Sequence, residues 1–175
     1  MATFAIDPAH TDVLFSAKHM MVTNVRGTFT DVSGSIDIDE TEPTASTADI
    51  TVRAASVDTG FAARDTHLRS DDFFAVETFP EIHVVSTKIQ PKGSNDFVVT
   101  ADVTIKDVTR PVTLDLEYLG TVASPWGDQR AGFSASTEIS RKDWGLGWNL
   151  ALEAGGVVVG DKVKLNIEAE AILQQ

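Results

Sequence analysis

The 175-residue chain contains no cysteine, which excludes disulfide bonds, thiol catalysis and metal or iron–sulfur sites with cysteine ligands. Basic residues are also scarce, with 14 lysines and arginines against 26 aspartates and glutamates and a formal net charge of −12. Such a surface repels phosphate backbones and anionic lipid headgroups. We therefore do not expect nucleic acid as a partner, nor peripheral docking on a membrane.

Long hydrophobic runs are missing as well. No segment approaches the ~20 apolar residues that a transmembrane helix requires, so no integral membrane segment is expected. The N-terminal MATFAIDPAH has neither a basic leader nor the apolar segment of roughly 7–15 residues that is typical of a signal peptide. The sequence therefore favours a cytoplasmic protein, or a periplasmic or secreted one if the chain is a processed form.

The motifs of common enzyme classes are absent. The chain has no GxSxG, P-loop, GxGxxG or HExxH pattern, and only four histidines. The acidic DIDE at 37–40 lacks the glycine and the distal glutamate of a calcium loop. A triad built from residues distant in sequence stays open, because triads are spatial arrangements. We predict a protein that is not an enzyme, with no catalytic residue, no metal site and no required cofactor.

What the chain does contain is an alternation of apolar and polar residues with a period of two. The alternation recurs at 13–21, 48–54, 97–105, 112–118 and 163–171. Strands with one polar face are typical of antiparallel sheets. About eight such strands without a second helical layer form a barrel or a sandwich. The length predicts one domain spanning 1–175.

The segment FAARDTHLRSDDFF at 61–74 departs from this alternation. Four of its residues share one helical face at i, i+3, i+4 and i+7 spacing: Phe61, Arg64, Asp65 and Leu68. We predict a short helix here that covers one mouth of a barrel.

Small side chains recur on the strand faces that should point inward: Ala17, Ala48, Ala54, Ser86, Ala101, Ala135, Ala169 and Ala171. They can leave a tunnel open, since an eight-stranded barrel holds either packed side chains or one ligand. Alternatively, phenylalanine and tryptophan side chains fill the barrel axis. Spacing alone leaves both alternatives open.

Two ionisable residues, His19 and Arg141, fall on apolar faces. An arginine that ends an inward face is costly unless an anion meets it, and either Asp65 or a ligand headgroup can supply that anion. The alternative is that both residues lie at the barrel rim, paired or solvated.

Five blocks in fixed order carry a family resemblance: FAIDPAHTDVLFSAKHMMV from Phe4, VRGTFTDVSGSI at 25–36, TGFAARDTHLRSDDFFAVETFPEIHVVS at 59–86, VTIKDVTRPVTL at 103–114 and GFSASTEISRKDWGL at 132–146. Together they resemble the YceI-like family of lipocalin-like polyisoprenoid-binding proteins over nearly the whole chain. Their ordered combination is specific, although no single block is. Val84 stands where many members carry phenylalanine, a departure that widens the expected cavity locally.

The resemblance implies an all-β, lipocalin-like, extended eight-stranded antiparallel barrel around a long apolar channel. The channel would hold an isoprenoid chain such as a quinone tail or a polyprenyl phosphate. We expect these residues to line it: Phe15, Ala17, Met21, Phe29, Leu68, Phe73, Phe74, Val84, Phe133 and Trp144. We expect four polar residues to meet the headgroup at the mouth, with the helix as the gate: His19, Arg64, Asp65 and Arg141.

The leading hypothesis is therefore non-catalytic binding, carriage or storage of a long isoprenoid lipid. A second hypothesis is an enzyme that acts on a lipid phosphate through His19 and Asp65. A third is a stress-linked interaction protein whose barrel is a packed core. Members of the family are often dimeric, which leaves a homodimer open.

Overall fold

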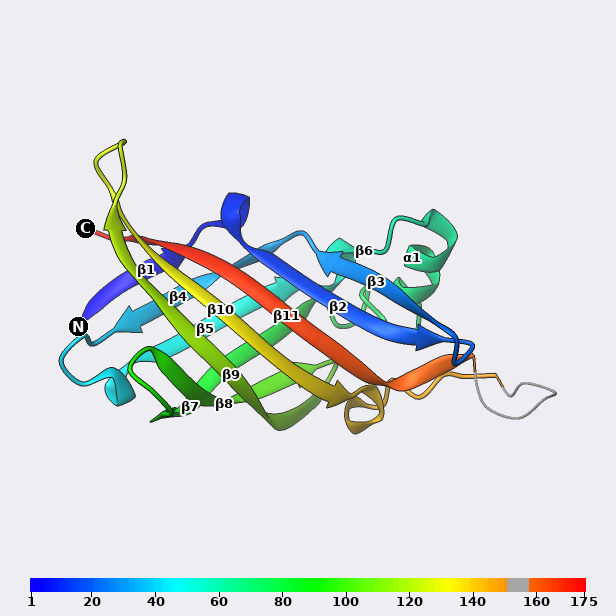
Figure 1. The fold of residues 1–175 in the computed structure, drawn as a ribbon. Coiled ribbons are helices and arrows are strands. Elements are labelled where there is room, and N and C mark those ends of the chain that lie inside the picture. Colours follow the sequence, from blue (N-terminus) through cyan, green and yellow to red (C-terminus); the bar gives the residue numbers. More distant parts are fainter. Residues whose placement is uncertain (151–157) are drawn as a thin grey trace.

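The computed structural model describes residues 1–150 and 158–175, and the strands of these ranges form one antiparallel sheet (Figure 1). The strands are β1 (Ala2–Ile6), β2 (Asp12–His19), β3 (Thr23–Phe29), β4 (Val32–Ile38), β5 (Thr47–Arg53), β6 (Val57–Asp58), β7 (Glu81–Pro91), β8 (Asp96–Ile105), β9 (Val108–Ala123), β10 (Gln129–Ser140) and β11 (Val159–Leu173). Helix α1 spans Ala62–Arg69, and 3-10 turns lie at η1 (Pro8–His10), η2 (Pro43–Ala45), η3 (Ala54–Ser56) and η4 (Arg141–Trp144). No helix in these ranges has the length and apolar content needed to cross a membrane.

The sheet closes on itself because β11 pairs with β1 as well as with β10 and β2. The ring runs β1-β4-β5-β7-β8-β9-β10-β11 and returns to β1. The predicted eight-stranded antiparallel barrel with a short helix is confirmed.

Three long strands of the barrel are each broken into two consecutive pieces: β1 and β2, β3 and β4, and β5 and β6. The sheet therefore has more assigned strands than the ring of eight. Between β1 and β2, Pro8 opens the turn η1, where the Asp7 side chain accepts the Ala9 N–H at 3.0 Å. Proline has no N–H to give to a ladder. The pieces β3 and β6 pair with each other beyond β4 and β5, so the wall continues toward α1.

The alternation in the sequence builds the two faces of the wall. Along β8, every second residue lines the interior: Phe97, Val99, Ala101, Val103 and Ile105. Asp96 and Asp102 are exposed on the outer face. The period of two therefore separates an apolar lumen from a charged surface.

The packed core lies at the α1 end of the barrel. Phe29 contacts Phe15 and Phe74, with ring centroids 5.5 and 5.7 Å apart. Phe73, Trp144 and several aliphatic residues complete this cluster. Helix α1 is shorter than the segment 61–74, and Phe73 and Phe74 lie in the turns that follow the helix. The helix and these turns close one end of the barrel.

Candidate ligand-binding cavity

The interior of the barrel holds a cavity of about 600 Å³. This volume lies within the ~300–1,000 Å³ that is usual for ligand pockets. Six of the predicted small residues line it: Ala17, Ala48, Ser86, Ala101, Ala135 and Ala169. Ala54 and Ala171 are instead buried in packed clusters, with at most 1% exposure. The alternative in which aromatic side chains fill the whole axis is therefore wrong.

Apolar side chains that point inward along the middle of the barrel are only half-buried. Val84, Leu114 and Leu165 line the cavity in this way, as do Val99 and Ile167. A filled core would bury such side chains almost completely. Their residual exposure means that the lumen is an accessible apolar surface.

The two ends of the cavity differ in character. Near α1 the lining residues are buried, among them Phe29, Phe73 and Trp144. At the opposite end the lining includes polar, largely exposed residues from the β4–β5 loop, the start of β5 and the β7–β8 turn: Asp39, Glu40, Ser46, Thr47, Ser94 and Asn95. Figure 1 shows these connections at the end away from α1. The accessible mouth is therefore opposite the helix.

Nine of the ten predicted channel residues line the cavity: Phe15, Ala17, Phe29, Leu68, Phe73, Phe74, Val84, Phe133 and Trp144. Met21 does not, and it is 61% exposed. Met20 and Met21 both adopt left-handed backbone with positive φ, which closes the β2–β3 hairpin and ends the alternation. Contact of these nine residues with a ligand remains a prediction.

Arg141 lines the cavity and is buried, and four of its five N–H groups donate to backbone carbonyls. It donates from Nε to Gly160 O at 3.0 Å, from Nη1 to Leu146 O and Trp148 O, and from Nη2 to Val159 O at 3.2 Å. The Asp161 carboxylate lies 3.6 Å from Nη2. Burial lowers the pKa of Arg141, and Asp161 opposes that shift. Arg141 thus joins η4 to the start of β11 through four of its five N–H groups, and the Asp161 carboxylate lies beside the nitrogen that carries the fifth.

Arg64 and Asp65 organise the turn that precedes α1. The buried Asp65 accepts the N–H and the hydroxyl of Thr59 at 2.9 and 2.5 Å. Arg64 donates to the Thr59 hydroxyl at 2.7 Å and to the Thr59 carbonyl at 2.9 Å. Neither residue lines the cavity, and His19 is exposed at the end of β2.

The four predicted headgroup residues are therefore not brought together. Sequence reasoning missed the polar groups of the accessible mouth, because DIDE (37–40) and PKGSND (91–96) have the composition of ordinary turns. Within the described ranges no histidine lines the cavity. The pairs His67–Asp72 and His83–Asp49 lie outside it. Nothing in this arrangement favours the enzymatic alternative.

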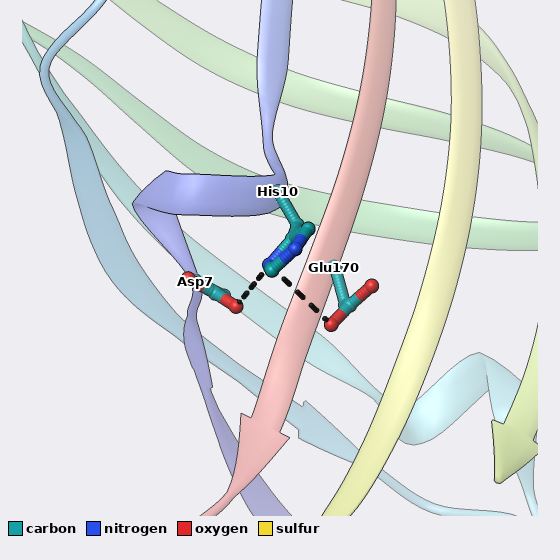
Figure 2. Close-up of side chains that lie close together, drawn as sticks. All are labelled: Asp7, His10 and Glu170. Atoms are coloured by element: carbon teal, nitrogen blue, oxygen red, sulfur yellow. Dashed lines mark hydrogen bonds and ion pairs between the residues drawn. The ribbon is translucent and has the colours of Figure 1, made fainter. Parts of the chain in front are cut away.

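A second polar cluster lies at the seam where the barrel closes, and we call it the seam cluster: Asp7, His10, Asp128, Arg130 and Glu170. In Figure 2, Asp7 and His10 of the β1–β2 connection approach Glu170 of β11. His10 Nδ1 lies 2.8 Å from Asp7 Oδ2 and 3.9 Å from Glu170 Oε1. Arg130 Nη1 lies 3.1 Å from Asp7 Oδ2 and 2.5 Å from Glu170 Oε1.

The charges of the seam cluster form a network of ion pairs rather than a metal site. Arg130 Nη1 already bridges the two carboxylates that a cation would need, so a metal ion there would be repelled. The hydrogen bond with Asp7 raises the pKa of His10, and the same bond lowers the pKa of Asp7 against the effect of its burial. Arg130 and Ser124 lower the pKa of Asp128 through their hydrogen bonds.

The family model described as the YceI-like domain matches residues 4–171. A UPF0312 protein of Staphylococcus epidermidis is 39% identical over 171 residues, which cover 97% of each chain. The crystal structure of Burkholderia cenocepacia BcnA superposes with a TM-score of 0.83 at 25% identity, covering 95% of this chain and 99% of BcnA. A polyisoprenoid binding domain from Saccharophagus degradans, implicated in plant cell wall breakdown, superposes with a TM-score of 0.71 over 99% and 100% of the chains. The sequences of this domain and of the chain are 16% identical, so the similarity shows a shared fold alone.

Proposed function

The chain belongs to the YceI-like domain family, and from this premise we propose that it binds a long isoprenoid lipid in the barrel lumen and carries or stores it without chemical change. The proposal rests first on the accessible apolar lumen of about 600 Å³. The fold shared with the Saccharophagus polyisoprenoid binding domain supports the choice of ligand class.

The length of the barrel favours a linear ligand. Strand β8, which pairs with a neighbour on both sides, has 10 residues, which at ~3.3 Å each is roughly 33 Å along the strand. A ligand gains about 0.3 kcal/mol per buried heavy atom in sites of this kind. Each five-carbon isoprene unit that enters the lumen therefore contributes about 1.5 kcal/mol, or about tenfold in affinity. A chain of several units binds tightly without any strong polar contact.

The charges around the cavity favour an uncharged headgroup, such as a quinone or an alcohol, over a phosphate. The accessible mouth carries Asp39 and Glu40, whereas four of the five Arg141 N–H groups donate to backbone carbonyls and Asp161 lies beside its guanidinium. A phosphate at this mouth would meet like charge. Ser46, Ser94 and Asn95 are neutral groups that can hydrogen-bond a hydroxyl or a quinone oxygen.

Native mass spectrometry followed by solvent extraction of the purified protein tests the proposal. We expect a co-purifying isoprenoid lipid, and uptake by delipidated protein of prenyl alcohols with affinity that rises with chain length until the lumen is full. An empty protein that takes up neither polyprenyl nor quinone ligands would refute it. The headgroup argument fails separately if a polyprenyl phosphate binds more tightly than the alcohol of equal length.

A further inference from the structure

We propose that the β9–β10 hairpin, residues 119–132, docks the open end of the barrel on a lipid bilayer whose headgroups carry no net charge. The inference stands on the surface of the hairpin, and it rests on the proposed function only for the cargo that such docking would transfer. Three large apolar side chains of this hairpin face solvent: Leu119 at 56%, Val122 at 65% and Trp126 at 77% exposure.

The register of the sheet explains why the hairpin projects. Strand β8 begins at Asp96, which pairs with Glu117 of β9. Strand β9 continues to Ala123 and pairs there only with β10. A bulge between Gly132 and Phe133 leaves Leu119 as the extra residue, and bulges of this kind bend a strand. Figure 1 shows the hairpin protruding beyond the barrel wall.

The base of the hairpin is part of the open mouth. Tyr118 and Phe133 line the cavity, with ring centroids 5.5 Å apart. The Tyr118 N–H donates to the carbonyl of Asn95, a residue of the polar mouth, at 2.8 Å. The projecting hairpin therefore begins at the rim of the open lumen.

The hairpin presents little net charge in a strongly acidic chain. Its charged residues are Asp128 and Arg130, which pair with each other at 3.1 Å. The guanidinium of Arg130 also lies 5.3 Å from the Trp126 ring centroid. Tryptophan favours the boundary between headgroups and acyl chains. Arg130 also pairs with Asp7 and Glu170 of the seam cluster, so the charges of the hairpin are all paired and insertion of its tip desolvates no unpaired charge. The net charge of −12 repels anionic lipid.

The exposed area argues for a bilayer rather than a second copy of the chain. Three exposed side chains of these sizes offer on the order of 400 Å² of apolar surface. A stable protein interface needs about 800 Å² from each partner. A narrow projecting tip suits insertion between headgroups, as in proteins that lie at the membrane interface.

Co-flotation of delipidated protein with phosphatidylcholine vesicles tests the inference, with brominated lipid as a quencher of the part of the tryptophan fluorescence that Trp126→Ser removes. Trp126→Ser should lower the vesicle partition coefficient about tenfold, and Val122→Ser should lower it less. Val22→Ser is the matched control, because Val22 is 76% exposed on the β2–β3 hairpin. It should leave partitioning unchanged. Added phosphatidylserine should weaken binding of the wild-type protein.

Wild-type protein that stays unbound, or equal partitioning of the Trp126→Ser and Val22→Ser variants, would overturn the inference. A dimer in sedimentation equilibrium that Trp126→Ser dissociates would assign the hairpin to a second copy instead. Thermal unfolding of each variant verifies that it is folded. Uptake of a prenyl alcohol without vesicles separates the two proposals: docking without uptake refutes only the proposed function, and uptake without docking refutes only this inference.

Discussion

Replacing Ala135 by phenylalanine tests whether the lumen is open space that a ligand uses. Ala135 lies on β10 and lines the cavity, paired with Leu116 of β9 and Ile167 of β11. The added ring occupies a volume on the order of 100 Å³, which equals the liquid volume of roughly three or four water molecules. That volume is close to the space of one isoprene unit. We expect affinity for a lumen-filling isoprenoid to fall about tenfold, or about 1.5 kcal/mol.

The same substitution should leave the free energy of unfolding unchanged or slightly raised, because the ring enters a void. The matched control is Ala131→Phe, four residues away on the same strand. Ala131 is fully buried in a packed cluster with Phe4 and Ala171 and does not line the cavity. Overpacking there should cost about 1–3 kcal/mol.

Urea titrations of both variants, with isothermal titration of prenyl alcohols of increasing length, give the two readouts. Equal destabilisation by Ala135→Phe and Ala131→Phe would show that the lumen is packed in solution. Unchanged affinity of Ala135→Phe for every chain length would show that the ligand does not occupy this part of the barrel.

Four further predictions concern the polar groups that hold the barrel together. Arg141→Lys should lower the free energy of unfolding by about 2–4 kcal/mol in urea titrations, because one ammonium cannot reach the carbonyls on both sides of the guanidinium; a change near zero would contradict this. Asp65→Ala should cost about 1.5–3 kcal/mol and expose α1 to proteolysis, because the Thr59 N–H and hydroxyl lose their acceptor; unchanged cleavage rates would argue against that role. The pKa of His10 is raised in the folded protein, so protonated His10 stabilises the fold fully at pH values below 6.5, the pKa in the unfolded chain. This contribution is lost as pH rises through the folded pKa, so the difference in free energy of unfolding between wild type and His10→Gln should shrink as pH rises. A difference independent of pH would refute the ion pair between His10 and Asp7. The lowered pKa of Asp7 has the opposite sense, and its contribution should disappear only as pH falls below 3.8.

The barrel itself was predictable because side-chain alternation is a local property that each strand carries by itself. The faces of 97–105 and 163–171 were assigned correctly from period two alone. The alternation did not show the breaks at η1 and η3, since these depend on which neighbouring strand each piece joins. Met21 was misplaced for a related reason: its left-handed backbone belongs to a hairpin that only pairing of β2 with β3 defines.

The candidate site was predictable in its apolar part and not in its polar part. Apolar residues on inward strand faces reach the lumen wherever the barrel closes, as Phe15, Val84 and Phe133 do. Leu68, Phe73, Phe74 and Trp144 lie outside the strands, and the family resemblance is what pointed to them. We expected a ligand headgroup to bind Arg64, Asp65 and Arg141. Their hydrogen-bond partners are instead backbone and hydroxyl groups of loops. Backbone acceptors leave no signature in a sequence, because every residue type supplies them.

The sequence by itself determined the two faces of each strand, the position of the short helix and the small side chains that keep the lumen wide. Only the tertiary structure decided that the lumen is open, that its mouth lies opposite α1, and that the β9–β10 hairpin stands beside that mouth. Whether a barrel is filled depends on the space between walls that meet across the chain. That space is set by ring closure between β1 and β11, which joins the two ends of the sequence.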